Sequence, residues 1–158
     1  MNAHLRTATI DDVELLIKLR FDFFATDDRI ISLEQLKQLE TSLRNYYKKN
    51  IGANFIAALI EDDTNILSTA FLSISEYPAN LSFPTGKIGT IFNVFTYPDY
   101  RKKGYATMAL NALIEEAKRQ NLSYIDLSAT ESGRPVYEKL GFIVKNAPYQ
   151  TEMILPLL

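Results

Sequence analysis

The chain has no cysteine and only one histidine, His4, among its 158 residues. Without cysteine it can form no disulfide bond, no thiolate metal site and no cysteine nucleophile, and a single histidine argues against a histidine-based metal site. It also lacks any apolar run as long as a membrane span, and its first residues contain no signal-peptide core. We therefore expect a cytoplasmic protein that binds neither a metal nor a membrane.

Charge of either sign is not in excess. Seventeen lysines and arginines against nineteen acidic residues give a formal net charge of −2, which argues against nucleic acid as the main partner. An apolar content of 47% with 23% charged residues is ordinary for a globular protein. The length and the absence of repeats or linkers predict one domain over residues 1–158, large enough for a core of its own.

Periodicity and turn residues predict a chain of mixed secondary structure. Thr9 and Ser32 are each followed three residues later by a side chain that completes a capping box, so each marks the start of a helix. Turn-forming residues 62–65 separate two strand patterns and predict a hairpin, which favours a mixed sheet over a doubly wound parallel one. We predict an α/β (α+β) fold of roughly seven strands and about four helices in the order βααβββαβαββ, with strands at residues 4–8, 55–60, 66–75, 88–95, 124–129, 142–144 and 151–155.

The most informative segment is residues 97–107. An apolar strand pattern at residues 88–95 leads into a turn with Arg101, Lys102, Lys103 and Gly104, and a helical pattern follows. A helix that begins after such a turn directs free backbone N–H groups and the positive end of its dipole at one point, which suits a pyrophosphate. Three successive basic residues alone are more often a solvated loop.

A second motif changes that balance. Residues 137–142 read Tyr-Glu-Lys-Leu-Gly-Phe, and with the basic turn they resemble the GNAT superfamily of acyl-CoA-dependent N-acyltransferases. The phosphate loop of that family has the form Arg/Gln-x-x-Gly-x-Gly/Ala, which Arg101, Gly104 and Ala106 match. These motifs cover residues 88–142, and the order of elements is similar over nearly the whole chain.

The resemblance implies a mostly antiparallel sheet that splays between its fourth and fifth strands, with coenzyme A entering the split. It implies that the backbone of Val94, Phe95 and Thr96 pairs with the pantetheine arm, although these side chains can equally be plain core. Acetyl-CoA would be the co-substrate and an amine the acceptor. The other implied contacts to the coenzyme come from Arg101, Lys102, Lys103, Gly104, Tyr105, Ala106, Thr107, Ser128, Ser132 and Arg134. For Ser132, a helix cap is the favoured alternative to a coenzyme contact.

The absence of cysteine leaves direct attack of the amine on the thioester, within a ternary complex, as the simplest route. The leaving thiolate then needs a proton. In the family, the tyrosine of the second motif lies near the coenzyme sulfur, so the resemblance assigns Tyr137 as the general acid. The alternative is a half-buried tyrosine that packs its helix on the sheet.

The general base is not evident. Many family members carry a glutamate on the fourth strand, where this chain has Asn93, which can hydrogen-bond a substrate or a water but cannot usefully accept a proton. Asp126 and Glu152 on later strands remain candidates, and each is more commonly an exposed strand carboxylate. His4 is chemically suited but is expected at a sheet edge. Loss of the proton to solvent is a further possibility.

The acceptor region is implied by the family to involve the first two helices and the loop between the third and fourth strands. Those segments contribute Phe21, Phe23, Phe24, Asp27, Asp28 and Tyr77. The phenylalanines fit a core equally well, and the aspartates a solvated loop. A coenzyme A-binding sensor without turnover is the alternative function, since a fold does not fix an activity. A homodimer is also possible, through the predicted final hairpin at residues 149–155.

Overall fold

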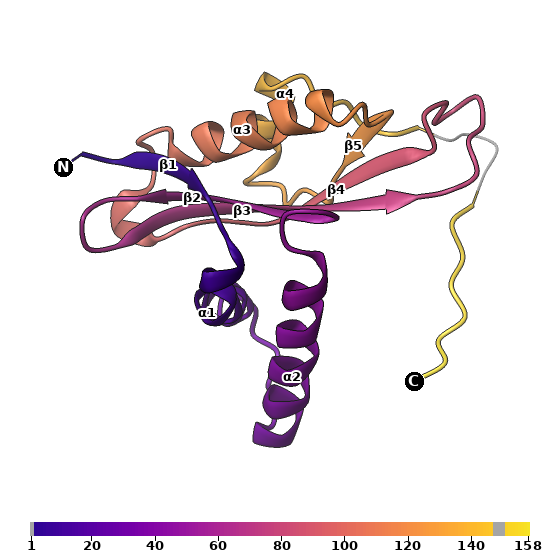
Figure 1. Ribbon diagram of the computed structural model, residues 1–158. Helices are drawn as coiled ribbons and strands as arrows, with labels where there is room; N and C mark the ends of the chain where they lie inside the picture. The colour runs from indigo at the N-terminus through magenta and orange to yellow at the C-terminus, as the bar shows by residue number, and fades with distance from the viewer. Residues whose placement is uncertain (1, 147–150) are drawn as a thin grey trace. The chain divides into compact units, whose positions relative to one another are not determined.

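The computed structural model describes residues 2–146 and 151–158 and comprises two compact units, Met1–Ser128 and Ala129–Leu158. The first unit is built on one five-stranded sheet of order β1-β2-β3-β4-β5 (Figure 1). Its strands are β1 (His4–Thr7), β2 (Phe55–Glu61), β3 (Ile66–Glu76), β4 (Lys87–Thr96) and β5 (Tyr124–Asp126). Its helices are α1 (Val13–Phe24), α2 (Leu33–Asn50) and α3 (Tyr105–Arg119), with the short 3-10 turns η1 (Ile10–Asp12) and η2 (Pro98–Tyr100).

The pairing of β4 is uneven along its length. β1 to β4 are antiparallel neighbours, whereas β5 runs parallel to β4. β5 pairs only with the first part of β4, from Ile88 opposite Tyr124 to Thr90 opposite Asp126. In the described part of the chain, residues 91–96 therefore continue past the last pair with one strand edge open.

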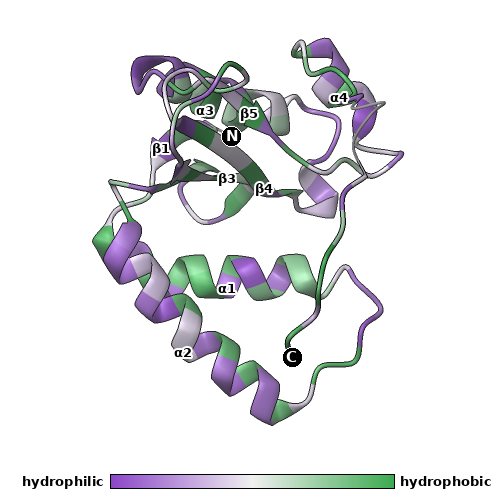
Figure 2. Cartoon of the chain, turned by 90° about the vertical axis from the view of Figure 1, so that its right-hand side faces the viewer, coloured by the Kyte–Doolittle hydropathy of each residue, from purple (hydrophilic) through white to green (hydrophobic). Residues whose placement is uncertain are grey.

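Helices cover both faces of this sheet (Figure 1). α1 and α2 lie on one face, where Leu16 and Leu19 pack with Phe55 and Phe71 of the sheet. α3 lies on the other face and buries Leu110 along with its neighbouring apolar residues. Figure 2 shows apolar and polar stretches alternating along α1 and α2, as amphipathic helices require. None of the helices in the described residues is both long and apolar enough to span a bilayer.

Local signals in the sequence explain where several elements begin and turn. Thr9 and Asp12 form the expected capping box at η1, and Ser32 and Gln35 form the one at α2. In the β2–β3 hairpin, Asp62 Oδ1 accepts the backbone N–H groups of the third and fourth turn residues at 2.9 and 2.8 Å. These contacts confirm the predicted caps and hairpin turn. Each could be predicted because it joins residues that are close in the sequence.

The described residues of the second unit form one short helix, α4 (Arg134–Lys139), and Gly141 follows its end with a φ of +95°. The two strands predicted at residues 142–144 and 151–155 are wrong, and so is the predicted element order that ends with them. Apolar residues there suggested strands, but a strand needs a paired neighbour. Ile143 and Ile154 are each 89% exposed, and no neighbouring strand pairs with them among the described residues. Part of the predicted connecting turn, residues 147–148, lies outside those residues.

The sheet therefore has five strands rather than the predicted seven. The strand predicted at residues 124–129 is also shorter, and ends at Asp126 where pairing with β4 ends. The mixed, mostly antiparallel character of the sheet is confirmed, with β5 as its parallel member.

Candidate functional site

The turn between β4 and α3 has an unusual backbone. Gly104 is the N-cap of α3 with a φ of +82°, and Lys102 has a φ of +60°, so two residues of the turn are left-handed. Glycine adopts this conformation without strain, whereas lysine does so at a cost. Among the described residues, the backbone N–H groups of residues 102–107 have no hydrogen-bond acceptor. The turn thus presents a row of free donors at the start of a helix.

The basic side chains around this turn are placed unfavourably for the stability of α3. Arg101, Lys102 and Lys103 are exposed, and the first turn of α3 contains no acidic residue. Cations at the positive end of a helix dipole are unfavourable for folding, so the arrangement is better suited to a bound anion. A Cβ added at Gly104 would meet no atom within 4 Å, which leaves the space in front of the donors open.

The end of β4 contains a β-bulge. The register with β3 shifts between Thr69 and Phe71, and Asn93 sits at the shift with a φ of +52°. Asparagine tolerates this left-handed conformation better than most residues. Thr69 Oγ1 donates to the carbonyl oxygen of Asn93 at 3.0 Å, and Ser68 Oγ lies 3.1 Å from that of Phe95. These hydroxyls fix the strand just before the basic turn.

Helix α1 contacts this bulge through Arg20. Arg20 Nη1 donates to Asn93 Oδ1 at 3.2 Å, and its guanidinium carbon lies 4.4 Å from the ring centre of Phe24 and 5.1 Å from that of Phe92. Burial lowers the pKa of Arg20. Nearby, burial raises the pKa of Tyr47 to about 12, and its hydroxyl is buried without a hydrogen-bond partner among the described residues.

A second contact joins α1 to the residue that opens the turn. The Tyr97 hydroxyl donates a hydrogen bond to Asp22, which also accepts one from Lys18 Nζ at 2.5 Å. Burial acts to raise the pKa of Asp22, but the bonds from Lys18 and Tyr97 lower it overall. Burial and Asp22 together raise the pKa of Tyr97. This network positions the start of the turn against α1.

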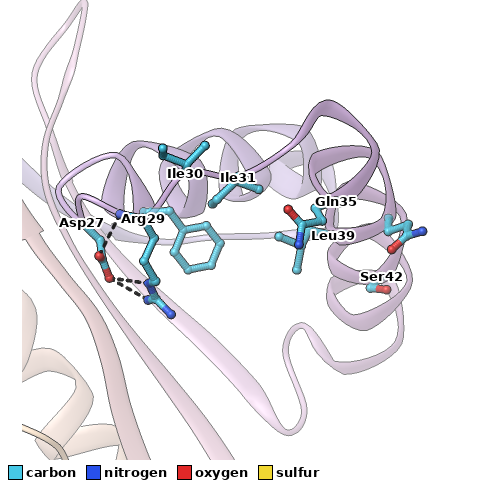
Figure 3. Close-up of a pocket in the computed structure, with 9 residues that line it drawn as sticks. Asp27, Arg29, Ile30, Ile31, Gln35, Leu39 and Ser42 are labelled. Carbon is cyan, nitrogen blue, oxygen red and sulfur yellow. Dashed lines mark hydrogen bonds and ion pairs between the residues drawn. The ribbon is translucent and has the colours of Figure 1, made fainter. Parts of the chain in front are cut away.

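A pocket of about 580 Å³ lies where the connection after α1 meets α2 (Figure 3). Figure 3 shows Asp27 and Arg29 joined at one end of it, and their ion-pair distance is 2.7 Å. The pocket is lined by Phe24, Asp27, Arg29, Ile30, Ile31, Gln35, Gln38, Leu39 and Ser42. Of the residues expected in the acceptor region, Phe24 and Asp27 thus line a pocket. Tyr77 lies elsewhere, half exposed in the β3–β4 loop, where it contacts the ring of Phe83.

The candidate bases of the first unit are occupied or distant. Asp126 accepts a hydrogen bond from Thr90 at 2.6 Å. Thr90 lies three residues before Asn93 on β4, which is about 10 Å along the strand at ~3.3 Å per residue. His4 lies on edge strand β1, three strands from β4, and contacts Glu61 at 3.2 Å. Neither side chain reaches the bulge of β4.

The second unit contains Tyr137 and two expected coenzyme contacts. Burial raises the pKa of Tyr137, and its ring centre lies 6.0 Å from that of Phe142. Arg134 is paired with Glu138 at 2.5 Å. The expectation that Ser132 caps the helix is wrong, because the N-cap is Gly133 and its N–H is held by Thr130 at 3.1 Å. Ser128, which ends the first unit, is exposed.

The family model described as the acetyltransferase (GNAT) family matches residues 19–142. The chain belongs to this family. The matched range contains the second half of α1, the bulge, the basic turn and the second motif. Family membership and the names of its relatives indicate that this GNAT protein is an N-acetyltransferase enzyme.

Individual proteins similar to this chain are also named as acetyltransferases. The chain is 28% identical over 135 residues to an uncharacterized N-acetyltransferase of Pyropia yezoensis, which covers 80% of this chain and 74% of that protein. A predicted acetyltransferase of Clostridium acetobutylicum, whose crystal structure contains acetyl-CoA, has a TM-score of 0.83 and 27% identity over 97% of this chain and 96% of that one. A GCN5-related N-acetyltransferase of Ralstonia eutropha has a TM-score of 0.80 and 25% identity, with 99% of both chains covered.

Three residues of the candidate site are not predicted from the sequence: Arg20, Asp22 and Tyr97, the last through its hydroxyl. A signal for Arg20 was present, since Leu16, Arg20 and Phe24 are spaced by four and share one face of α1. A charged residue in an apolar stripe usually has a specific partner or ligand. Within residues 2–146 and 151–158, no group of three or more histidine or acidic side chains is placed to hold a metal.

Proposed function

We propose that this enzyme transfers an acetyl group from acetyl-CoA to a primary amine by direct attack in a ternary complex. The observation that carries the proposal is the turn before α3, with its free N–H groups, its basic residues and the open space at Gly104. These features suit the coenzyme pyrophosphate. The acetyl-CoA bound in the Clostridium acetobutylicum protein, at 27% identity, supports the same co-substrate here.

The open edge of β4 would hold the pantetheine arm. Since β5 pairs with β4 only as far as Thr90, an extended ligand would add to the unpaired edge of β4 along Val94, Phe95 and Thr96. The Thr96 carbonyl oxygen already accepts a hydrogen bond from Arg101 Nε at 3.0 Å. Added in this way, the arm would run beside the bulge at Asn93 with its pyrophosphate at residues 101–107. The thioester would then lie near Asn93, whose left-handed backbone shapes the strand at the reaction centre.

The acetyl transfer requires two proton transfers, one from the amine and one to the departing thiolate. A lysine-like amine is charged at pH 7, and its neutral, reactive form costs about 4–5 kcal/mol there. We propose that the amine loses its proton to solvent, because Asn93 cannot accept one and is only 1% exposed, and Asp126 is engaged by Thr90. The departing thiolate would take its proton from Tyr137, whose raised pKa keeps the hydroxyl protonated.

A thiol-release assay with acetyl-CoA and a panel of amines tests this function, with the acetylated product identified by mass. The proposal expects one thiol and one N-acetylated amine per turnover. Binding of acetyl-CoA without product on any amine would instead support the coenzyme A-binding sensor. A second test replaces Lys102 and Lys103 by glutamine. This double variant should weaken acetyl-CoA binding about tenfold or more, because the turn loses two positive charges.

A further inference from the structure

Arg20 differs in its partners from four of the other five arginines of the first unit. In the described part of the chain, no carboxylate lies within ion-pair distance of Arg20, although it is largely buried beside β4. Its hydrogen bond to Asn93 uses a neutral acceptor and one of the five N–H donors of a guanidinium. By contrast, carboxylates pair with Arg6, Arg29, Arg44 and Arg119. Arg101 has no carboxylate partner among the described residues either, but it is exposed to solvent and donates to the carbonyl oxygen of Thr96.

The surroundings of Arg20 make this lack of a counter-ion costly. The rings of Phe23, Phe24 and Phe92 lie with their centres 5.8, 4.4 and 5.1 Å from the guanidinium carbon. Such rings stabilise a cation through their faces but replace much of the water around it. A partly desolvated charge attracts an anion more strongly than one in bulk water does.

The nearby acids are already engaged. Asp22, two residues further along α1, is bound by Lys18 and Tyr97. Asp27 is bound by Arg29. A partly buried cation thus lies at the bulge of β4, and residues 2–146 and 151–158 provide no carboxylate within ion-pair distance of it.

We propose that Arg20 binds the carboxylate of the acceptor, so that the acceptor is a small amine that also carries a carboxylate, as amino acids do. The inference rests on the proposed function, which puts the thioester beside Asn93, the residue that Arg20 contacts. A carboxylate matches the planar donor fork of a guanidinium. In an α-amino acid one carbon separates the amine from this group, so a carboxylate on Arg20 brings the amine to the same end of β4.

The test compares amino acids with their carboxamides, which lose the negative charge, and expresses kcat/KM per neutral amine because the carboxamide also lowers the pKa of the amine. The wild-type enzyme should prefer the acid by about 10–100-fold in kcat/KM, the usual effect of a charge-assisted hydrogen bond. Arg20→Gln should remove that preference by lowering activity on the acid while leaving the amide within about threefold. Arg20→Lys should retain part of it, and Arg119→Gln, which changes an exposed arginine at the end of α3, should retain all of it.

Calorimetry with coenzyme A present separates this inference from the proposed function. Tighter binding of the acid than of the amide, lost in Arg20→Gln, would support the carboxylate site even if no turnover occurred. Turnover with equal kcat/KM for acid and amide in the wild-type enzyme would overturn the inference and leave the acetyltransferase function standing. A stronger preference for amines that carry a phosphate, or an equal loss on acid and amide in Arg20→Gln, would also overturn it.

Discussion

The hydroxyl of Tyr97 donates a hydrogen bond to the carboxylate of Asp22, which links the residue after β4 to helix α1. Two residues earlier on the same helix, Arg20 donates to Asn93 within β4. α1 therefore holds both the bulge and the start of the basic turn. In the proposed complex these are the two ends of the coenzyme arm, so the position of α1 should affect coenzyme binding as well as stability.

The Tyr97–Asp22 contact should contribute measurably to both properties. Tyr97→Phe and Asp22→Asn should each lower the free energy of unfolding by about 1–2 kcal/mol, with a coupling of at least ~0.5 kcal/mol between them. Each should also weaken acetyl-CoA binding about threefold or more through a less well positioned turn. A double-mutant cycle by urea unfolding, with calorimetry on each variant, measures these effects. Strictly additive losses would show that the contact contributes nothing.

Acid should destabilise the protein partly through Asp12. The two hydrogen bonds from Arg6, at 2.8 and 2.9 Å, lower the pKa of Asp12 against the opposing effect of burial. A carboxyl with a lowered folded pKa stabilises the fold above its ordinary pKa of about 3.9, and this stability is lost as the pH falls through the folded value.

Asp12→Asn should therefore lower the free energy of unfolding by about 1–2 kcal/mol at pH 7 and by much less at pH 3. Urea unfolding at both pH values checks this. Asp63→Asn, in the exposed β2–β3 turn, is the control and should have little effect at either pH. A loss for Asp12→Asn that is equally large at pH 3 would show that its charge is not the cause.

Tyr137 should act on the chemical step. Tyr137→Phe removes the proton donor while keeping the ring that packs against Phe142. We expect kcat to fall by about 10²–10⁴-fold, the usual size of general-acid assistance, with acetyl-CoA affinity nearly unchanged. Steady-state kinetics and calorimetry on the same variant separate the two. A wild-type kcat would mean that the role of Tyr137 is structural.

No single carboxylate should be indispensable as a base. The rate should rise with pH toward the pKa of the acceptor amine, and acceptors of lower pKa should shift the profile to lower pH. Asp126→Asn and Glu152→Gln should each cost less than about tenfold in kcat/KM. A loss of several hundredfold in a folded variant, together with loss of the rising limb, would identify that residue as the base.

Local patterns predicted much of the first unit. The capping boxes, the hairpin turn and the passage from β4 through a basic turn to α3 all depend on residues close in the sequence. Strand formation depends on a partner elsewhere, so the apolar residues at 142–144 and 151–155 predicted strands that the structure does not contain. β5 likewise ends where its pairing ends.

The candidate site was also predictable only where it depends on residues close in the sequence. The turn could be found from Gly104 and its basic neighbours, whereas the Arg20–Asn93 contact joins residues 73 positions apart. The bulge that brings them together arises from the register of β3 against β4, which no local pattern encodes.

Calorimetry of acetyl-CoA on two glycine variants tests whether the turn before α3 binds the coenzyme phosphates. Gly104 and Gly52 both have a left-handed φ, +82° and +77°, and a Cβ on either would meet no atom within 4 Å. Valine at either position should therefore strain the backbone similarly. We expect Gly104→Val to weaken acetyl-CoA binding by about a hundredfold, through blocked phosphate contacts, and Gly52→Val to bind acetyl-CoA as the wild type does. Equal affinity in the two variants would contradict phosphate binding by this turn.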